Sequence, residues 1–63
     1  MNDTRPTALI AEDEPLMRER LKERLAETWP ELEIVAEAAD GDAALALFVV
    51  HEPRVAFLDI SMP

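Results

Sequence analysis

The stretch that decides the fold is residues 54–63, which read RVAFLDISMP. Four apolar residues, Val55 to Leu58, run without a polar break into the carboxylate of Asp59. An apolar run of this kind is typical of a strand that is buried on both faces, as in a parallel sheet. We therefore expect a strand that presents Asp59 at its C-terminal end, and such a strand needs neighbours in a sheet.

Two other stretches of the chain are candidates for those neighbours. Residues 7–11 (TALIA) are mostly apolar and open onto an acidic loop that begins at Glu12. Residues 32–38 (LEIVAEA) are interrupted by two glutamates, which favours a strand nearer the edge of the sheet. Because the first stretch is the more uniformly apolar, we expect it to lie centrally, between the second and third strands.

A first helix is expected over residues 15–29. Met17, Leu21 and Leu25 recur every four residues and Trp29 extends the same stripe, so one face should pack on the sheet. Arginines interleave with glutamates between these positions, and we interpret them as a solvated face whose ion pairs contribute little. These arginines are Arg18, Arg20 and Arg24.

A second helix is expected from about Ala43 to His51, after a loop at residues 40–42. Its core face should consist of Ala44, Leu45 and Phe48. Residues 47–50 are consecutive apolar residues, so they cannot all face one sheet. The surplus is either tolerated exposure of scattered hydrophobic side chains or a contact surface for another chain or domain.

The order strand, helix, strand, helix, strand with short loops predicts right-handed crossovers and a parallel sheet. The fold class is therefore α/β, a βαβαβ portion of a doubly wound parallel sheet with strand order 2-1-3.

Composition narrows the classes of function. At 63 residues the chain is at most one small domain, and with no cysteine and one histidine it has neither a disulfide nor a His/Cys zinc site. A net charge of -8 disfavours direct contact with nucleic acid and suits divalent cations or a basic partner. We interpret residues 1–6 as a disordered tail without a secretory signal. No apolar run reaches the ~20 residues of a membrane helix, so a cytoplasmic location without membrane contact is expected.

Three carboxylates should meet at one edge of the predicted sheet. If the first and third strands are parallel neighbours, Glu12, Asp13 and Asp59 lie where open α/β sheets bind ligands, at the C-terminal ends of the strands. Their mutual repulsion is relieved either by protonation of one carboxyl group or by a divalent cation such as Mg²⁺. Each acid alone is more often a helix cap or a loop residue. Asp59 follows the most apolar strand, which makes it the candidate nucleophile or central ligand.

The residues that support this site also carry a family resemblance. Residues 11–15 (AEDEP), 39–45 (ADGDAAL) and 57–63 (FLDISMP) resemble the receiver domain of bacterial two-component response regulators. The resemblance covers residues 7–63 and implies that the chain is the N-terminal part of a single, incomplete flavodoxin-like receiver domain. The first helix is most similar to that of receivers that precede LytTR-type DNA-binding domains, which implies a role in transcription regulation.

The resemblance also implies a role for each matching residue. Asp59 is the expected phosphoacceptor, phosphorylated by a sensor histidine kinase. The expected Mg²⁺ site consists of Asp13 and Asp59 as direct ligands, the Ser61 backbone carbonyl, and Glu12 through a water molecule. A receiver catalyses its own phosphorylation and no independent enzymatic turnover is expected. The family's later Thr or Ser and Lys positions are not among these residues, so little phosphotransfer is expected of the 63 residues alone.

Two other classes of function remain to be weighed. An open, apolar edge of the third strand would favour a structural role, in which the chain forms a homodimer or pairs with a strand of another chain. A hydrolase or nucleotide-binding enzyme is disfavoured, because the first strand leads into an acidic turn without the glycines of a phosphate-binding loop.

Overall fold

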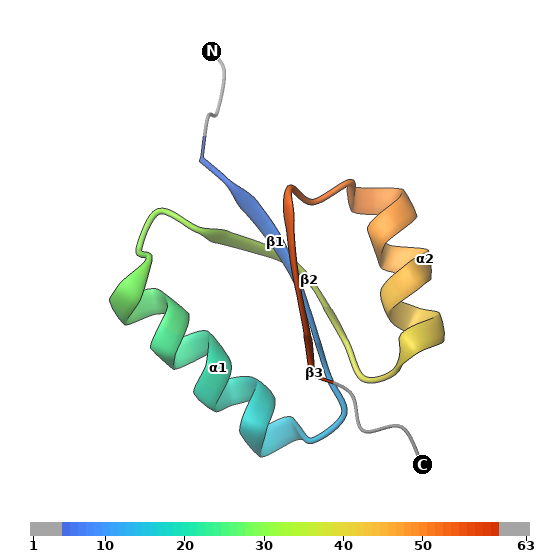
Figure 1. The fold of residues 1–63 in the computed structure, drawn as a ribbon, viewed down its shortest axis with the longest axis horizontal. Coiled ribbons are helices and arrows are strands. Elements are labelled where there is room, and N and C mark those ends of the chain that lie inside the picture. The colour runs from blue at the N-terminus through green and yellow to red at the C-terminus, as the bar shows by residue number, and fades with distance from the viewer. Residues whose placement is uncertain (1–4, 60–63) are drawn as a thin grey trace.

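The structure is a computed structural model that describes residues 5–59. Its elements in chain order are β1 (Thr7–Glu12), α1 (Pro15–Thr28), β2 (Glu33–Ala38), α2 (Gly41–His51) and β3 (Val55–Asp59). The strands form one parallel sheet in the order β2-β1-β3 (Figure 1). The predicted α/β class, the five elements and the strand order 2-1-3 are confirmed.

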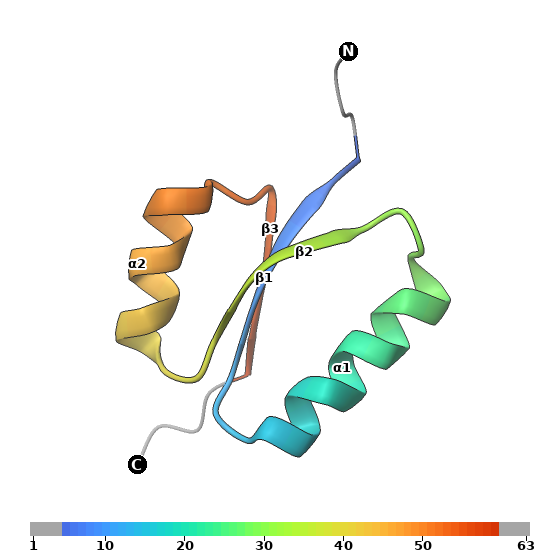
Figure 2. The same cartoon turned by 180° about the vertical axis from the view of Figure 1, so that it is seen from behind.

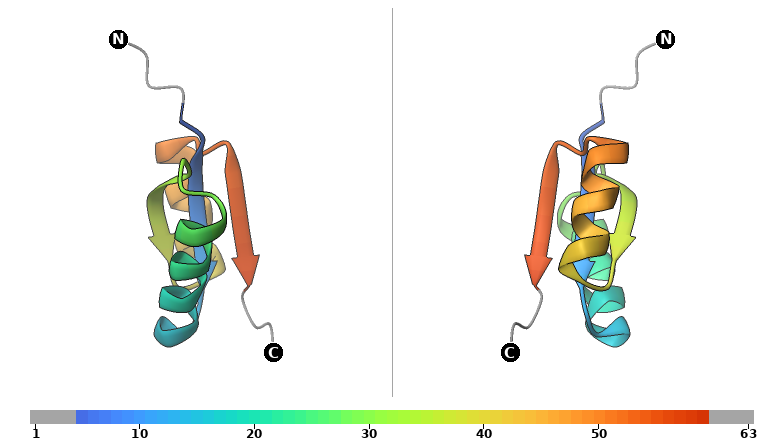
Figure 3. Two further views of the ribbon diagram at one scale, coloured as in Figure 1. Left: turned by 90° about the vertical axis from the view of Figure 1, so that its left-hand side faces the viewer. Right: turned by 90° about the vertical axis from the view of Figure 1, so that its right-hand side faces the viewer.

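The two helices cover opposite faces of the sheet. Helix α1 lies on one side and α2 on the other, as Figure 1 and the reverse view in Figure 2 show. Helix α1 packs against β1, whereas α2 packs against both β1 and β2. In both views of Figure 3, β3 lies to the side of the helix in front. Within residues 5–59, neither helix therefore covers β3.

The core is centred on β1, as expected from its apolar sequence. Ala8, Leu9, Ile10 and Ala11 are each at most 1% exposed. Side chains alternate between the two faces of a strand, so Leu9 and Ala11 face one way and Ile10 the other. The larger cluster joins β1, β2 and α2 through small side chains: Leu9, Ala11, Ala36, Ala38 and Ala44.

Strand β3 differs from its prediction as a strand buried on both faces. Val55 and Phe57 are partly buried, but Ala56 is exposed and Leu58 is 67% exposed. The apolar run predicted a strand correctly. The prediction of burial was wrong for the described residues, because α1 packs toward β1 and α2 packs toward β1 and β2, which leaves β3 at an uncovered edge.

Helix α2 begins at Gly41, slightly before the predicted start. The side chain of Asp40 caps it by accepting a hydrogen bond from the Ala43 N–H at 2.8 Å. At the other end Glu52 takes a left-handed conformation with φ of 47°, and Pro53 follows.

The predicted core face of α2 is only partly correct. Ala44 is buried, but Leu45 is 66% exposed and Phe48 is 45% exposed. The helix instead packs through Ala44 with Ala43 and Leu47 beside it, because these side chains point to β1 and β2. Phe48, Val49 at 66% exposure and Val50 at 73% exposure form the surplus apolar surface that the sequence predicts within residues 47–50, and the exposed Leu45 adds to it.

Helix α1 packs more loosely than its apolar stripe predicts. None of its residues is buried, and Leu21 and Leu25 are only partly so. Met17 is 43% exposed and Trp29 is 37% exposed. The helix still starts at the predicted proline, Pro15, with its first hydrogen bond running from the Arg18 N–H to the Glu14 carbonyl at 2.9 Å.

Candidate functional site

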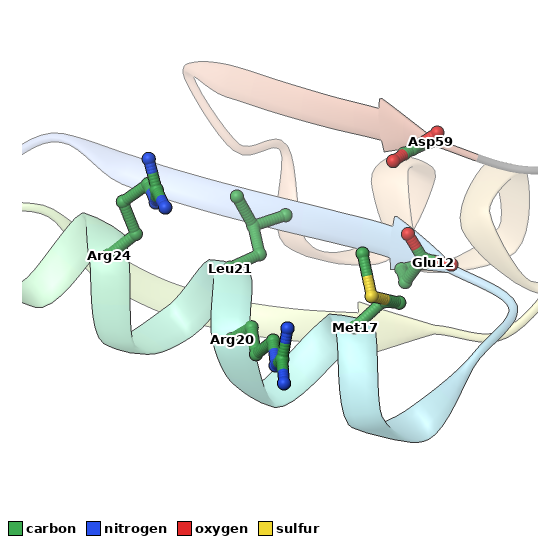
Figure 4. Close-up of a pocket in the computed structure, with 6 residues that line it drawn as sticks. All are labelled: Glu12, Met17, Arg20, Leu21, Arg24 and Asp59. Atoms are coloured by element: carbon green, nitrogen blue, oxygen red, sulfur yellow. The ribbon is translucent and has the colours of Figure 1, made fainter.

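The C-terminal ends of β1 and β3 bring two carboxylates together. Glu12 is the last residue of β1 and pairs in register with Asp59, the last residue of β3. Paired residues of neighbouring parallel strands point to the same face, and Figure 4 shows the two side chains at adjacent strand ends. The sequence predicted this meeting from the apolar runs that precede each acid.

Glu12 is held at both its side chain and its backbone. The residue is 5% exposed, and its Oε2 accepts a hydrogen bond from the Glu14 N–H at 3.0 Å. Its backbone carbonyl accepts from the Arg18 guanidinium at 3.4 Å. Hydrogen bonds to Glu12 thus connect the start of α1 to the end of β1.

The crowding of acids changes the protonation of Glu12. The hydrogen bond from the Glu14 N–H lowers the pKa of the Glu12 carboxyl group. Burial, a hydrogen bond with Asp13 and the negative charges of Asp59 and Asp13 act the other way, and the pKa ends above its ordinary value of 4.5. Ionisation of the Glu12 carboxyl group therefore costs more free energy than ionisation of a free glutamate side chain, and a nearby cation would lower that cost.

Asp13 and Asp59 are both exposed and accessible to a ligand or phosphodonor. Ser61, the fourth predicted site residue, lies outside the described residues. Within residues 5–59 no group of three His, Cys, Asp or Glu side chains is arranged to hold a metal ion. The structure thus places Glu12 beside Asp59 with Asp13 next in the chain, but does not gather the three carboxylates into one ligand set.

The donor chemistry nevertheless suits Mg²⁺. This ion takes one or two protein carboxylates and keeps several water molecules. Two neighbouring carboxylate side chains, one of which has a pKa raised by burial and by the other acids, meet that requirement without a cluster of three.

An open cavity of about 280 Å³ adjoins the acidic pair between α1 and the sheet. Its lining consists of Glu12, Met17, Arg20, Leu21, Arg24 and Asp59. In Figure 4 the carboxylates lie at one end, near Met17, and Arg24 lies at the other end of the row. The cavity joins an acidic end to an apolar floor formed by α1.

Sequence reasoning missed the contribution of Arg18. The sequence pattern places Arg18 on a solvated face, but its side chain is only 18% exposed and bends back to Glu12. The available signal was its position in the first turn of a helix that begins next to the acidic loop.

No helix within residues 5–59 is long and apolar enough to span a membrane.

The chain is similar in sequence to several known proteins. A family model described as the response regulator receiver domain matches residues 8–63. An uncharacterized response regulatory protein of Vibrio cholerae is 56% identical over 63 residues, which are 100% of this chain and 24% of that protein. The transcriptional regulatory protein PdtaR of Mycobacterium tuberculosis is 47% identical over 55 residues, covering 87% of this chain and 26% of PdtaR.

A third relative carries a different name. A protein-glutamate methylesterase/protein-glutamine glutaminase of Carboxydothermus hydrogenoformans is 46% identical over 54 residues, which cover 86% of this chain and 16% of that protein. The chain spans about a quarter or less of the length of these three relatives. No solved structure matches the chain.

Proposed function

Because this chain belongs to the response regulator receiver domain family, we propose that it is a phosphoacceptor module in which a sensor histidine kinase phosphorylates Asp59 in the presence of Mg²⁺. The observation that carries the proposal is the register of β1 with β3, which sets Glu12 beside Asp59 at the ligand-binding edge of the sheet. Asp59 is the exposed member of this pair, so a phosphodonor has access to it.

In the proposed reaction a carboxylate oxygen of Asp59 attacks the phosphorus of a phosphohistidine. The bond between phosphorus and the histidine nitrogen breaks, the nitrogen keeps the electron pair, and Asp59 becomes an aspartyl phosphate. Asp13, Asp59 and the backbone carbonyl of Ser61 would hold Mg²⁺, with Glu12 acting through a water molecule. The ion supplies positive charge where the acids and the phosphoryl oxygens crowd together.

The family match supports a signalling role for this segment, and we propose that the segment itself turns over no independent substrate. PdtaR is named a transcriptional regulatory protein, and the methylesterase relative is named for an enzymatic activity. We propose a transcriptional output of the LytTR type on the likeness of α1 to such receivers, and a cytoplasmic location. The comparisons do not favour the alternative of a self-associating interaction fragment.

The experiment that tests the phosphoacceptor is a chemical phosphorylation of the purified chain. The chain is incubated with acetyl phosphate and Mg²⁺, and the intact mass is measured for wild type, Asp59→Asn and Asp42→Asn. Asp42 is an exposed aspartate in the first turn of α2 and is the matched control. We expect a single phosphoryl adduct of low yield on the wild type and the control, and none on Asp59→Asn.

An adduct of equal yield on Asp59→Asn would show that the phosphoacceptor is another residue. Omission of Mg²⁺ with excess EDTA should abolish the adduct on the wild type.

A further inference from the structure

A network of ion pairs joins α1 to β2 next to the acidic site. The Arg18 Nε lies 3.9 Å from Glu37 Oε1, and the Lys22 Nζ lies 3.0 Å from Glu37 Oε2. Lys22 also pairs with Glu19 at 3.2 Å within the helix. We call Arg18, Lys22 and Glu37 the α1–β2 brace. It connects the strand at one edge of the sheet to the helix that starts at the site.

An irregularity in strand pairing places Glu37 where it meets α1. The register of β1 with β2 shifts between Ala8 and Leu9, so that Ala8 pairs with Ile34 but Leu9 pairs with Ala36. Glu37 consequently pairs with Ile10, which faces away from the cluster of Leu9 and α2. Since a shift of one residue moves a side chain to the other face, an unbroken register would have turned Glu37 toward α2.

The brace acts on the site through Arg18. Its guanidinium group reaches Glu37 on one side and the backbone carbonyl of Glu12 on the other. We propose that Arg18 and Glu37 are positioning residues for cation binding: Glu37 orients Arg18, and Arg18 fixes the end of β1 from which Glu12 and Asp13 project. This inference rests on the proposed function, because it concerns the same Mg²⁺ site.

Charge and geometry both support this role. A guanidinium group beside an acidic site opposes a bound cation unless its own charge is offset, and Glu37 offsets it. The rigid planar fork of arginine holds its donors in fixed, divergent directions, whereas the three donors of a lysine ammonium group rotate on a flexible stem. The hydrogen bond to Glu37 also raises the pKa of Lys22 above its ordinary value of 10.5.

The test uses charge-conserving and charge-matched variants of the full chain. Arg18→Lys keeps the charge and removes the fork, and its control is Arg54→Lys, at the opposite end of the sheet from the site. Glu37→Gln removes the brace carboxylate. Its control is Glu33→Gln, which removes an equal charge from the same strand and breaks an ion pair with Arg5 at 3.4 Å.

Two readouts are measured by NMR on the isotope-labelled chain. Titration with Mg²⁺ alone gives the affinity, and amide hydrogen exchange without metal reports the Glu14 N–H, which donates to Glu12. Arg18→Lys and Glu37→Gln should each weaken Mg²⁺ binding by about 10-fold, the lower end of what supporting contacts contribute to metal sites. Both should also accelerate exchange at Glu14. The double variant should bind Mg²⁺ no more weakly than the single variant that has the lower affinity.

The outcomes separate positioning from general stability. Ala44→Gly loosens the core on the opposite face and should leave Mg²⁺ affinity unchanged. The positioning role would be overturned if Arg18→Lys and Glu37→Gln matched their controls in Mg²⁺ affinity and in amide exchange at Glu14. The proposed function would remain intact in that case. A wild-type chain that binds no Mg²⁺ at millimolar concentration would overturn both.

Discussion

Replacement of Leu58 by alanine tests whether β3 is uncovered in solution. Burial of a whole leucine side chain contributes about 1.5–3 kcal/mol. Leu58 is 67% exposed, so about a third of that contribution, roughly 0.5–1 kcal/mol, is lost when the side chain is truncated. Leu9 is 1% exposed in the neighbouring strand, and the same change there should cost about 2–5 kcal/mol because it also leaves a cavity.

The free energies of unfolding are measured by urea titration with far-UV circular dichroism, at several protein concentrations. Wild type, Leu58→Ala and Leu9→Ala form a matched set, because the same atoms are deleted from two neighbouring strands. A loss of about 2 kcal/mol or more for Leu58→Ala, near that of a buried leucine, would refute the exposed edge. If the urea midpoints depend on protein concentration, the element that covers β3 is a second copy of the chain.

Three further outcomes follow from local contacts. Asp40→Ala removes the side-chain cap on the Ala43 N–H and should lower the free energy of unfolding by about 1 kcal/mol in the same urea assay. Gly41→Ala should raise it by about 0.4–1 kcal/mol, because Gly41 has no positive φ and an added Cβ meets nothing within 4 Å. Because the pKa of Glu12 is raised above 4.5, the folded chain binds this proton more tightly than the unfolded chain. Stability should therefore fall as the pH rises from 4.5 through the folded pKa. In Glu12→Gln that decline should be reduced, and a decline of unchanged size would assign it to another group.

The sequence predicted the elements that have strong local signals. The apolar runs before Glu12 and Asp59 define two strands, and parallel pairing then requires their C-terminal ends to meet. The order of the strands followed because β1 is apolar from Ala8 to Ala11, whereas two glutamates interrupt β2. The pairing of two predicted site residues was accordingly available from the sequence.

Which faces of these elements are buried by other elements could not be predicted in the same way. An apolar run shows that a strand can be buried on both faces, but the covering element lies elsewhere in the chain. Leu58 on β3 and Leu45 on α2 are exposed although their local patterns predict burial. Alanines 43 and 44 make the contact with the sheet, because small side chains allow α2 to approach β1 and β2 closely.

The two glutamates of β2 show why the contacts that support the site could not be predicted from the sequence either. In the sequence, Glu33 and Glu37 are equivalent interruptions of an apolar strand, and both favour a position near the edge of the sheet. In the structure Glu33 pairs with Arg5, near the start of the sheet, whereas Glu37 pairs with Arg18 and Lys22. The difference arises from the register shift between β1 and β2, which depends on two strands at once. A residue's influence on the site therefore follows from the register of its strand, which no pattern within that strand alone reveals.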